Sequence, residues 1–265
     1  MSARLDAELA ARGLARSRTQ AAVLIAAGAV TVAGAVATKP SLRVDRDADI
    51  RVTGGDQYVS RAAHKLIAAL DGFGVDAAGR TALDMGASTG GFTQVLLERG
   101  ASPVIAVDVG HDQLAPSLRA DERVRSVEGY NVRHMTAESL AESSGVDSAP
   151  SVVTGDLSFI SLRYVLPAVA AVIGRSPADV LLLVKPQFEV GRTGVRGGIV
   201  VDPELRRRAV HDVIGRAREA GFAVRGVLPS PVEGTHGNRE ALMHLTPGPD
   251  DGRDWDHEVG LAVAG

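Results

Sequence analysis

Lysine is so rare in this chain that each lysine is a candidate for chemistry that arginine cannot perform. Of the 29 basic residues, only Lys39, Lys65 and Lys185 are lysines, and the others are arginines. Arginine stays protonated in proteins, whereas lysine can give up its proton. Lys185 ends the apolar run of DVLLLVKPQFE, which predicts a central parallel strand. Because catalytic groups collect at the carboxyl edge of such sheets, Lys185 is the strongest candidate of the three.

A glycine-rich turn between two predicted strands indicates a nucleotide-binding site. Residues 81–84 predict the first strand, 92–98 a helix and 104–109 the second strand. The turn has the pattern Asp-x-Gly-x-x-x-Gly, which departs from the dinucleotide pattern GxGxxG and is similar to the S-adenosylmethionine pocket of Rossmann-like methyltransferases. A site for another nucleotide and a tight structural turn are the alternatives. The candidate cofactor-binding residues are Asp84, Gly86, Ala87, Ser88, Gly90, Gly91, Phe92 and Asp108, the last of which could accept hydrogen bonds from ribose hydroxyls.

Two later predicted strands, ending at Asp156 and Lys185, extend the same edge of the sheet. Each is followed three residues later by a phenylalanine, Phe159 or Phe188. In a chain with 3% aromatic residues, this shared offset suggests walls for a planar base, although core packing explains either ring taken alone. A Gly/Arg-rich segment that contains Arg192 is expected to face phosphate groups.

The N-terminal part of the chain contains an uncharged segment that has to be distinguished from a membrane-spanning helix. Residues 21–38, AAVLIAAGAVTVAGAVAT, are uncharged and reach the minimum length for crossing a bilayer. Most of them are Ala, Gly or Thr, which insert weakly. The period of the apolar residues also changes within the run. They have helical spacing after a Ser17 N-cap, and then alternate with a period of two around a turn at Ala33-Gly34. The run therefore predicts a helix followed by a hairpin.

The charge of this first segment suggests a polyanionic partner. Residues 1–43 carry six basic side chains against two acidic ones, which suits a phosphate backbone, although a solvated surface is an equal alternative. The candidate RNA contacts there are Arg4, Arg16, Arg18 and Lys39.

Composition describes an ordinary soluble globular protein of 265 residues, with 45% hydrophobic residues and a net charge of −3. The absence of cysteine excludes disulfides and thiolate metal sites and is compatible with the cytoplasm. The N-terminus lacks the apolar core of a signal peptide. Asp202 is predicted to cap a helix that begins at Pro203. The acidic, Gly/Pro-rich residues 248–265 predict a disordered tail.

Several segments occur in the order found in one family. RLDAELAARGLARSRTQAAVLIAAGAVTV, YVSRAAHKL, LDMGASTGGFT, DLSFISL, VKPQFEVGR and GNREALMHL together resemble the TlyA family, whose members are described as hemolysins and as ribosomal RNA 2'-O-methyltransferases. The resemblance implies an S-four RNA-binding domain joined to an FtsJ-like methyltransferase domain. It also implies a Lys-Asp-Lys-Glu tetrad at the 2'-hydroxyl and a cofactor contact from Asn131 in the NVR segment. The tetrad falls on Lys65, Asp156, Lys185 and Glu240.

These inferences define the expected protein. Its fold class is α/β, with an N-terminal α+β domain and linker at 1–58 and a Rossmann-like sheet with helices on both faces at 59–247. The predicted activity is S-adenosylmethionine-dependent, metal-free 2'-O-methylation of a ribose, by resemblance a cytidine, in 16S or 23S ribosomal RNA or in ribosomal subunits in the cytoplasm. Lys185 is the expected base or oxyanion stabiliser. The alternatives are a membrane-active hemolysin and a non-catalytic, RNA-binding ribosome assembly factor.

Overall fold

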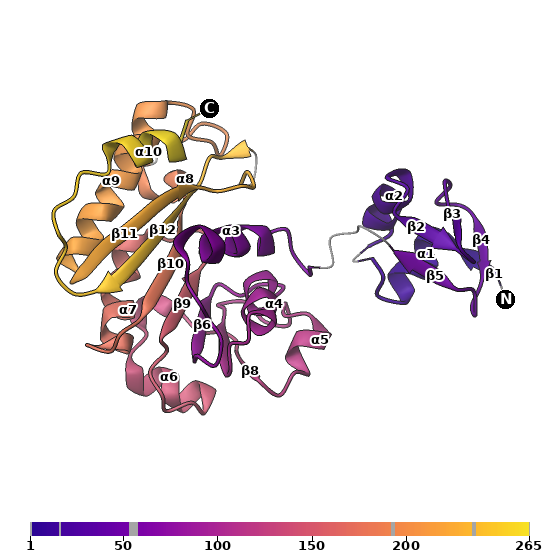
Figure 1. Ribbon diagram of the computed structural model, residues 1–265, viewed down its shortest axis with the longest axis horizontal. Coiled ribbons are helices and arrows are strands. Elements are labelled where there is room, and N and C mark those ends of the chain that lie inside the picture. The colour runs from indigo at the N-terminus through magenta and orange to yellow at the C-terminus, as the bar shows by residue number, and fades with distance from the viewer. Residues whose placement is uncertain (1, 16, 53–57, 192–193, 235–236, 265) are drawn as a thin grey trace. The chain divides into compact units, whose positions relative to one another are not determined.

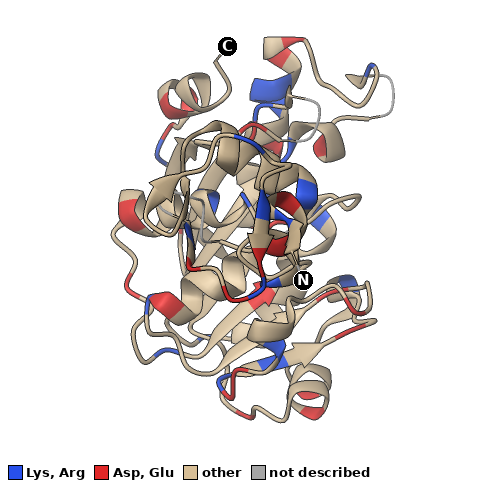
Figure 2. Ribbon diagram, turned by 90° about the vertical axis from the view of Figure 1, so that its right-hand side faces the viewer, with Lys and Arg blue, Asp and Glu red and all other residues tan. Residues whose placement is uncertain are grey.

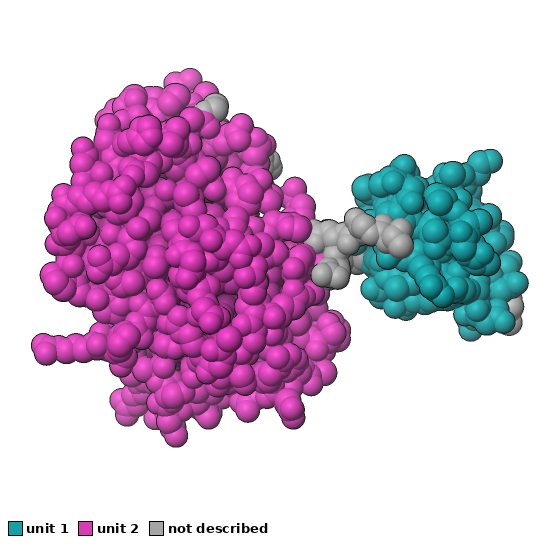
Figure 3. Space-filling model, in the orientation of Figure 1, with its two compact units in different colours: residues 1–57 teal, residues 58–265 magenta. Residues whose placement is uncertain are grey.

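The computed structural model describes residues 2–15, 17–52, 58–191, 194–234 and 237–264. The chain forms two units, residues 1–57 and 58–265, coloured separately in Figure 3. Their division lies one residue from the boundary expected from the sequence. The elements of the first unit are β1 Ser2–Arg4, α1 Leu5–Ala11, α2 Arg18–Ala26, β2 Val30–Val32, β3 Ala35–Val36, β4 Arg43–Asp45 and β5 Ile50–Val52.

The long uncharged run is a helix followed by a hairpin, as its pattern predicts. Ser17 caps α2 by accepting a hydrogen bond from Gln20 N. Strands β2 and β3 are joined by Ala33 and Gly34, whose φ angles of 49° and 81° are typical of the type I′ turn of tight hairpins. Throughout the described residues, every helix is too short or too polar to cross a bilayer.

The second unit is built on one seven-stranded sheet. Its elements are α3 Ala63–Phe73, β6 Ala82–Met85, α4 Gly91–Glu98, β7 Val104–Val107, α5 Pro116–Arg119, β8 Val124–Val127, the 3-10 turn η1 Val132–His134, α6 Ala137–Ser144, β9 Val152–Gly155, the 3-10 turn η2 Leu162–Tyr164, α7 Leu166–Ile173, β10 Asp179–Val184, α8 Pro186–Glu189, α9 Pro203–Glu219, β11 Phe222–Pro229, β12 Ala241–Pro247 and α10 Asp256–Ala262. The predicted cap of α9 is confirmed, because Asp202 accepts a hydrogen bond from Glu204 N.

The strand order places a ligand site at the centre of the sheet. The order is β11-β12-β10-β9-β6-β7-β8, in which β12 runs antiparallel to both of its neighbours and the other ladders among β6 to β10 are parallel. The chain winds outward in opposite directions from β6 and β9. Open α/β sheets bind ligands outside the carboxyl ends of the strands at this kind of switch point.

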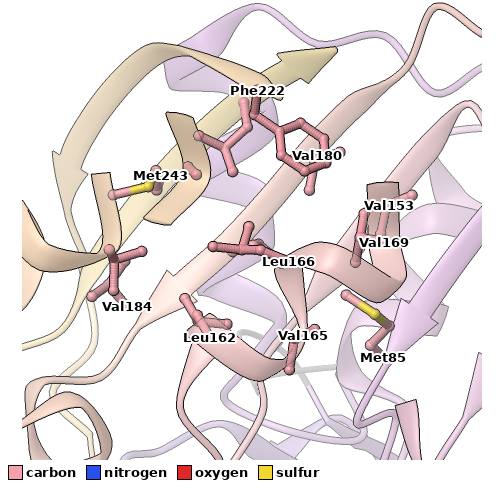
Figure 4. Packing of buried hydrophobic residues seen from close by; sticks show 14 of the residues in the cluster. Met85, Val153, Leu162, Val165, Leu166, Val169, Val180, Val184, Phe222 and Met243 are labelled. Carbon is pink, nitrogen blue, oxygen red and sulfur yellow. The ribbon is translucent and has the colours of Figure 1, made fainter. Parts of the chain in front are cut away.

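Helices cover both faces of the sheet, as predicted (Figure 1). One buried cluster joins the strands to α6, α7, α9 and α10, and a second cluster joins them to α3, α4 and α5. Figure 4 shows the first cluster, in which Leu166 and Val169 of α7 lie against Val153 and Val180 of the strands. Because both faces of β6 and β7 are covered, every residue of these strands is buried.

The prediction of a disordered C-terminal tail is wrong. Residues 256–262 form α10, which packs on β11 and α9, and Trp255, Val259 and Ala262 belong to the main core. The acidic, glycine-rich composition concealed this helix. Its buried side chains nevertheless recur at spacings of four and three residues, which is the signature of an amphipathic helix.

Candidate functional site

Two adjoining cavities lie at the carboxyl edge of the sheet. Their volumes are about 700 Å³ and about 230 Å³, and they share Gly86, Ser88, Asp156 and Ser158 in their walls. Asp108 and Asn131 line the larger cavity. The four tetrad residues together with Ala87, Gly91 and Phe92 contribute to the walls of the smaller one.

The glycine-rich loop is pressed against the end of the neighbouring strand. Gly86 N and Ala87 N both donate to Val107 O, at 2.9 and 3.1 Å. Gly86 has a φ of 78°, and a Cβ at this position would lie 3.3 Å from Asp156 O and 3.1 Å from the Leu157 side chain. Glycine is therefore needed both for the backbone conformation and for the close approach to the residues that follow β9.

Asp108 fixes the loop from the second strand. Its half-buried carboxylate accepts hydrogen bonds from Ser88 N and Gly110 N, both at 2.8 Å. A carboxylate has about four lone-pair positions, so two remain for a ligand in the larger cavity. Asn131, on the same cavity, uses its Oδ1 to accept from Arg133 N and so orders η1.

Two of the predicted cofactor contacts lie behind the loop instead of in the walls of the cavities. Asp84 is 1% exposed, and its carboxylate accepts a hydrogen bond from Thr93 Oγ1 at 2.7 Å. Burial raises the pKa of Asp84 to about 7, although the Thr93 hydrogen bond opposes the shift. Gly90 has a φ of 99°, and a side chain there would collide with Leu118. Both residues therefore shape the turn, and neither of them lies in the walls of the two cavities.

The four tetrad side chains form a row of alternating charges. Lys65 Nζ lies 2.6 Å from Glu240 Oε2 and 3.8 Å from Asp156 Oδ2, and Lys185 Nζ lies 2.7 Å from Asp156 Oδ1. Lys65, Lys185 and Glu240 are less than a tenth exposed. Each buried charge thus has an opposite charge beside it, which offsets the cost of removing it from water.

Four separate elements bring this row together. Asp156 directly follows β9, and Lys185 follows β10 and is the N-cap residue of α8. Glu240 directly precedes β12, whose antiparallel course beside β10 carries its start to the carboxyl edge. Lys65 comes from α3, which packs on β12. The arrangement depends on the insertion of β12 between β10 and β11, which strand patterns alone do not reveal.

Phe159 and Phe188, the two phenylalanines that follow β9 and β10, contact each other in the wall of the larger cavity. Their ring centroids are 5.2 Å apart, and the planes are tilted by 51°. Phe159 is 92% exposed and has a φ of 65°, a conformation that is strained for a residue with a side chain. Core packing is therefore excluded as the explanation for Phe159, and the exposed ring is available to stack on a base.

Of the predicted RNA contacts in the first unit, two form ion pairs with the same carboxylate and one is exposed. Arg4 and Arg18 both form ion pairs with Asp6, at 3.0 and 3.1 Å, which lowers the pKa of this carboxyl to about 2, with the Arg4 hydrogen bond the largest cause. Lys39 is exposed. The predicted RNA contacts Arg16 and Arg192 lie outside the described residues.

Sequence reasoning missed a residue that contacts the tetrad. Ser158 Oγ accepts a hydrogen bond from Lys185 Nζ at 3.0 Å and lies in the walls of both cavities. Its place in the DLSF segment, two residues after Asp156, was the available signal. Within the described part of the chain, no group of three or more His, Cys, Asp or Glu side chains is arranged to hold a metal ion.

Comparison with known proteins identifies both units. Residues 58–246 match the model of the FtsJ-like methyltransferase family, and residues 3–50 match that of the S4 domain. The 16S/23S rRNA (cytidine-2'-O)-methyltransferase TlyA of Mycobacterium tuberculosis is 52% identical over 92% of this chain and 89% of its own. Hemolysin A of Brachyspira hyodysenteriae is 38% identical over 91% and 99%. The solved structure of a candidate hemolysin from Streptococcus thermophilus matches with a TM-score of 0.74 and 38% identity, over 99% of this chain and 94% of its own.

Proposed function

Because the chain belongs to the FtsJ-like methyltransferase family, and within it to the TlyA group, we propose that it methylates a ribose 2'-hydroxyl of ribosomal RNA. The observation that carries this proposal is the row of four alternating charges beside the glycine-rich loop. A 2'-hydroxyl is a weak acid, so the reaction needs a group that removes its proton and groups that hold it in line.

The part of the larger cavity around Asp108 and the glycine-rich loop fits S-adenosylmethionine. The free lone pairs of Asp108 suit the ribose hydroxyls of the cofactor, and the loop from Gly86 to Phe92, which has no bulky side chain before Phe92, leaves room for the rest. Asn131 also lines this cavity. When bound, S-adenosylmethionine supplies a methyl group activated by a sulfonium.

The tetrad residues then divide the work on the RNA. Lys185 gives its own proton to solvent and then accepts the proton of the 2'-hydroxyl, while Asp156 and Ser158 hold its Nζ in place. Lys65 positions the ribose, and Glu240 orients Lys65 through their 2.6 Å contact. Phe159 and Phe188 form the wall for the target base, which we infer to be a cytidine because the Mycobacterium tuberculosis relative is a cytidine-2'-O-methyltransferase.

The first unit is proposed to hold the RNA through its phosphate backbone. It matches the S4 domain, and Lys39 presents an exposed cation on it. Because such contacts release counterions, the affinity they give weakens as salt rises.

The test is methyl transfer to ribosomal RNA. The protein is incubated with labelled S-adenosylmethionine and with separated ribosomal subunits from a strain that lacks the enzyme. We expect label in the RNA of at least one subunit. Cofactor binding without transfer to either subunit would favour the non-catalytic assembly factor, and leakage of liposomes without cofactor would favour the hemolysin.

A further inference from the structure

Two arginines converge on an exposed tyrosine at the rim of the larger cavity. The guanidinium carbons of Arg133 and Arg163 each lie 4.4 Å from the centroid of the Tyr164 ring, and Arg163 also donates a hydrogen bond to the Tyr164 hydroxyl. Tyr164 is 38% exposed, and both arginines are exposed. All three residues line the larger cavity. None of them is needed for the proposed chemistry at the tetrad.

The guanidinium groups of Arg133 and Arg163 form no close ion pair among the described residues, although the Glu189 carboxylate attracts Arg163 from a longer distance. Basic and acidic positions are intermixed along the ribbon (Figure 2), and many exposed arginines form ion pairs, as Arg119 does with Glu128 and Arg216 with Glu219. Among the residues that the structure describes, no carboxylate lies within ion-pair distance of Arg133 or Arg163. Unpaired arginines beside an aromatic ring suit an anionic ligand that also has a flat face.

A further hollow, called the second hollow below, lies next to Arg163 and Tyr164 and is distinct from the two cavities of the sheet edge. It has a volume of about 630 Å³ and lies over α7 and α9, where Pro167 and Arg216 line it together with Arg163 and Tyr164. Arg163 and Tyr164 therefore line both the larger cavity and the second hollow. A chain that leaves the larger cavity at this side would pass over Tyr164 before it reaches the surface of the two helices.

The turn that carries the pair is firmly attached to the active-site wall. Ser161 caps η2 by accepting from Arg163 N, and Glu189 at the end of α8 accepts from Ser161 Oγ at 2.6 Å and from Leu162 N at 2.9 Å. Phe188, which faces the target base in our proposal, immediately precedes Glu189. The position of Arg163 and Tyr164 is thereby fixed relative to the base wall.

We propose that Arg163 and Tyr164 form a subsite for the nucleotide next to the methylated one. The RNA strand would run from the smaller cavity, which the tetrad lines, past the two phenylalanines of the larger cavity and into the second hollow. Tyr164 stacks on the neighbouring base, and Arg163 binds the phosphate between the two nucleotides. The inference rests on the proposed function, since it takes RNA as the substrate. It adds a recognition step outside the reacting nucleotide.

Two measurements on the full-length protein test this subsite. The first is binding of a fluorescent single-stranded cytidine oligoribonucleotide at several salt concentrations. Tyr164→Ala should weaken binding roughly 5- to 150-fold, because one stacked base is lost. Arg163→Ala should lower the slope of log affinity against log salt by about 0.7, the value for one phosphate on a single strand. The second is methyl transfer to ribosomal subunits, where both variants should raise the KM for RNA and leave kcat and cofactor affinity unchanged.

Conservative variants and a remote arginine provide the controls. Tyr164→Phe keeps the ring and Arg163→Lys keeps the charge, so both should stay within about three-fold of wild type. Arg175→Ala removes an exposed charge between α7 and β10, at the opposite edge of the sheet, and should change neither quantity. Equal melting temperatures would show that all variants are folded.

The subsite and the proposed methyltransferase activity are tested by different results. Oligonucleotide affinity and salt slope equal to wild type in both alanine variants would overturn the subsite, whatever the enzyme methylates. A wild-type protein that transfers no methyl group to either subunit would refute the proposed function, and a selective loss of oligonucleotide binding in the two variants would still support the subsite.

Discussion

Replacing Lys185 by arginine separates the two roles that its amine could have. Lys185 Nζ contacts Asp156 Oδ1 at 2.7 Å and Ser158 Oγ at 3.0 Å, so a guanidinium at this position keeps a positive charge beside the carboxylate. Arginine stays protonated and cannot accept the hydroxyl proton. General base catalysis typically contributes about 10²- to 10⁴-fold. If Lys185 is the base, Lys185→Arg should lower the transfer rate by about 100-fold or more.

The assay is single-turnover methyl transfer as a function of pH, with Lys185→Met as the companion variant. Lys185→Met leaves the largely buried Asp156 with Lys65 at 3.8 Å as its remaining cation in the tetrad. Loss of a buried ion partner costs up to about 3 kcal/mol of stability, so this variant should melt earlier, whereas Lys185→Arg should not. Cofactor and RNA binding should stay near wild type in the arginine variant.

The result that would refute the base role is a Lys185→Arg enzyme within about three-fold of wild type that keeps the shape of its pH–rate profile. Lys185 would then act only as a cation that stabilises the oxygen as it loses its proton. A fast Lys185→Met enzyme would exclude both roles.

Three further predictions concern residues that support the site. In denaturant unfolding, Asp84→Asn should be more stable than wild type by up to about 4 kcal/mol at pH 8 and nearly equal to it at pH 4. The raised pKa of about 7 means that Asp84 stabilises the fold at low pH and loses this contribution as pH rises through 7, so a stability difference that does not change with pH would contradict the burial argument. Asp108→Ala should weaken cofactor binding about 10- to 100-fold or more by calorimetry, since it also releases Ser88 N; unchanged affinity would mean that the cofactor ribose is held elsewhere. Glu189→Ala should raise the KM for RNA several-fold at unchanged cofactor affinity, because it removes the acceptor of both hydrogen bonds that hold η2. An unchanged KM would show that the turn holds without them.

Local patterns were sufficient to predict the elements that end at the site. The apolar runs before Asp156 and Lys185 are buried parallel strands, and the glycine-rich loop and the Asp202 cap lie where the sequence indicates. These features depend on short-range periodicity, turn chemistry and capping, which a single sequence records directly.

Long-range pairing explains what could not be predicted. The contact between Lys65 and Glu240 joins residues 175 positions apart and depends on the antiparallel insertion of β12. Before the structure, only the family resemblance connected them. The pairing of Arg4 and Arg18 with one buried carboxylate, Asp6, is likewise absent from a charge count. Asp84 had the right residue type beside the loop, but its burial gives it a supporting position.

The most direct test of the central claim is to identify the atom that receives the methyl group. Ribosomal RNA methylated by the wild-type protein is digested to nucleosides and analysed by mass spectrometry, and the modified position is mapped by resistance to alkaline cleavage. The account predicts 2'-O-methylcytidine at a discrete site, absent from RNA treated with a Lys65→Met, Glu240→Gln double variant that still binds the cofactor. A methyl group on a base, or a 2'-O-methyl signal that persists in the double variant, would contradict it.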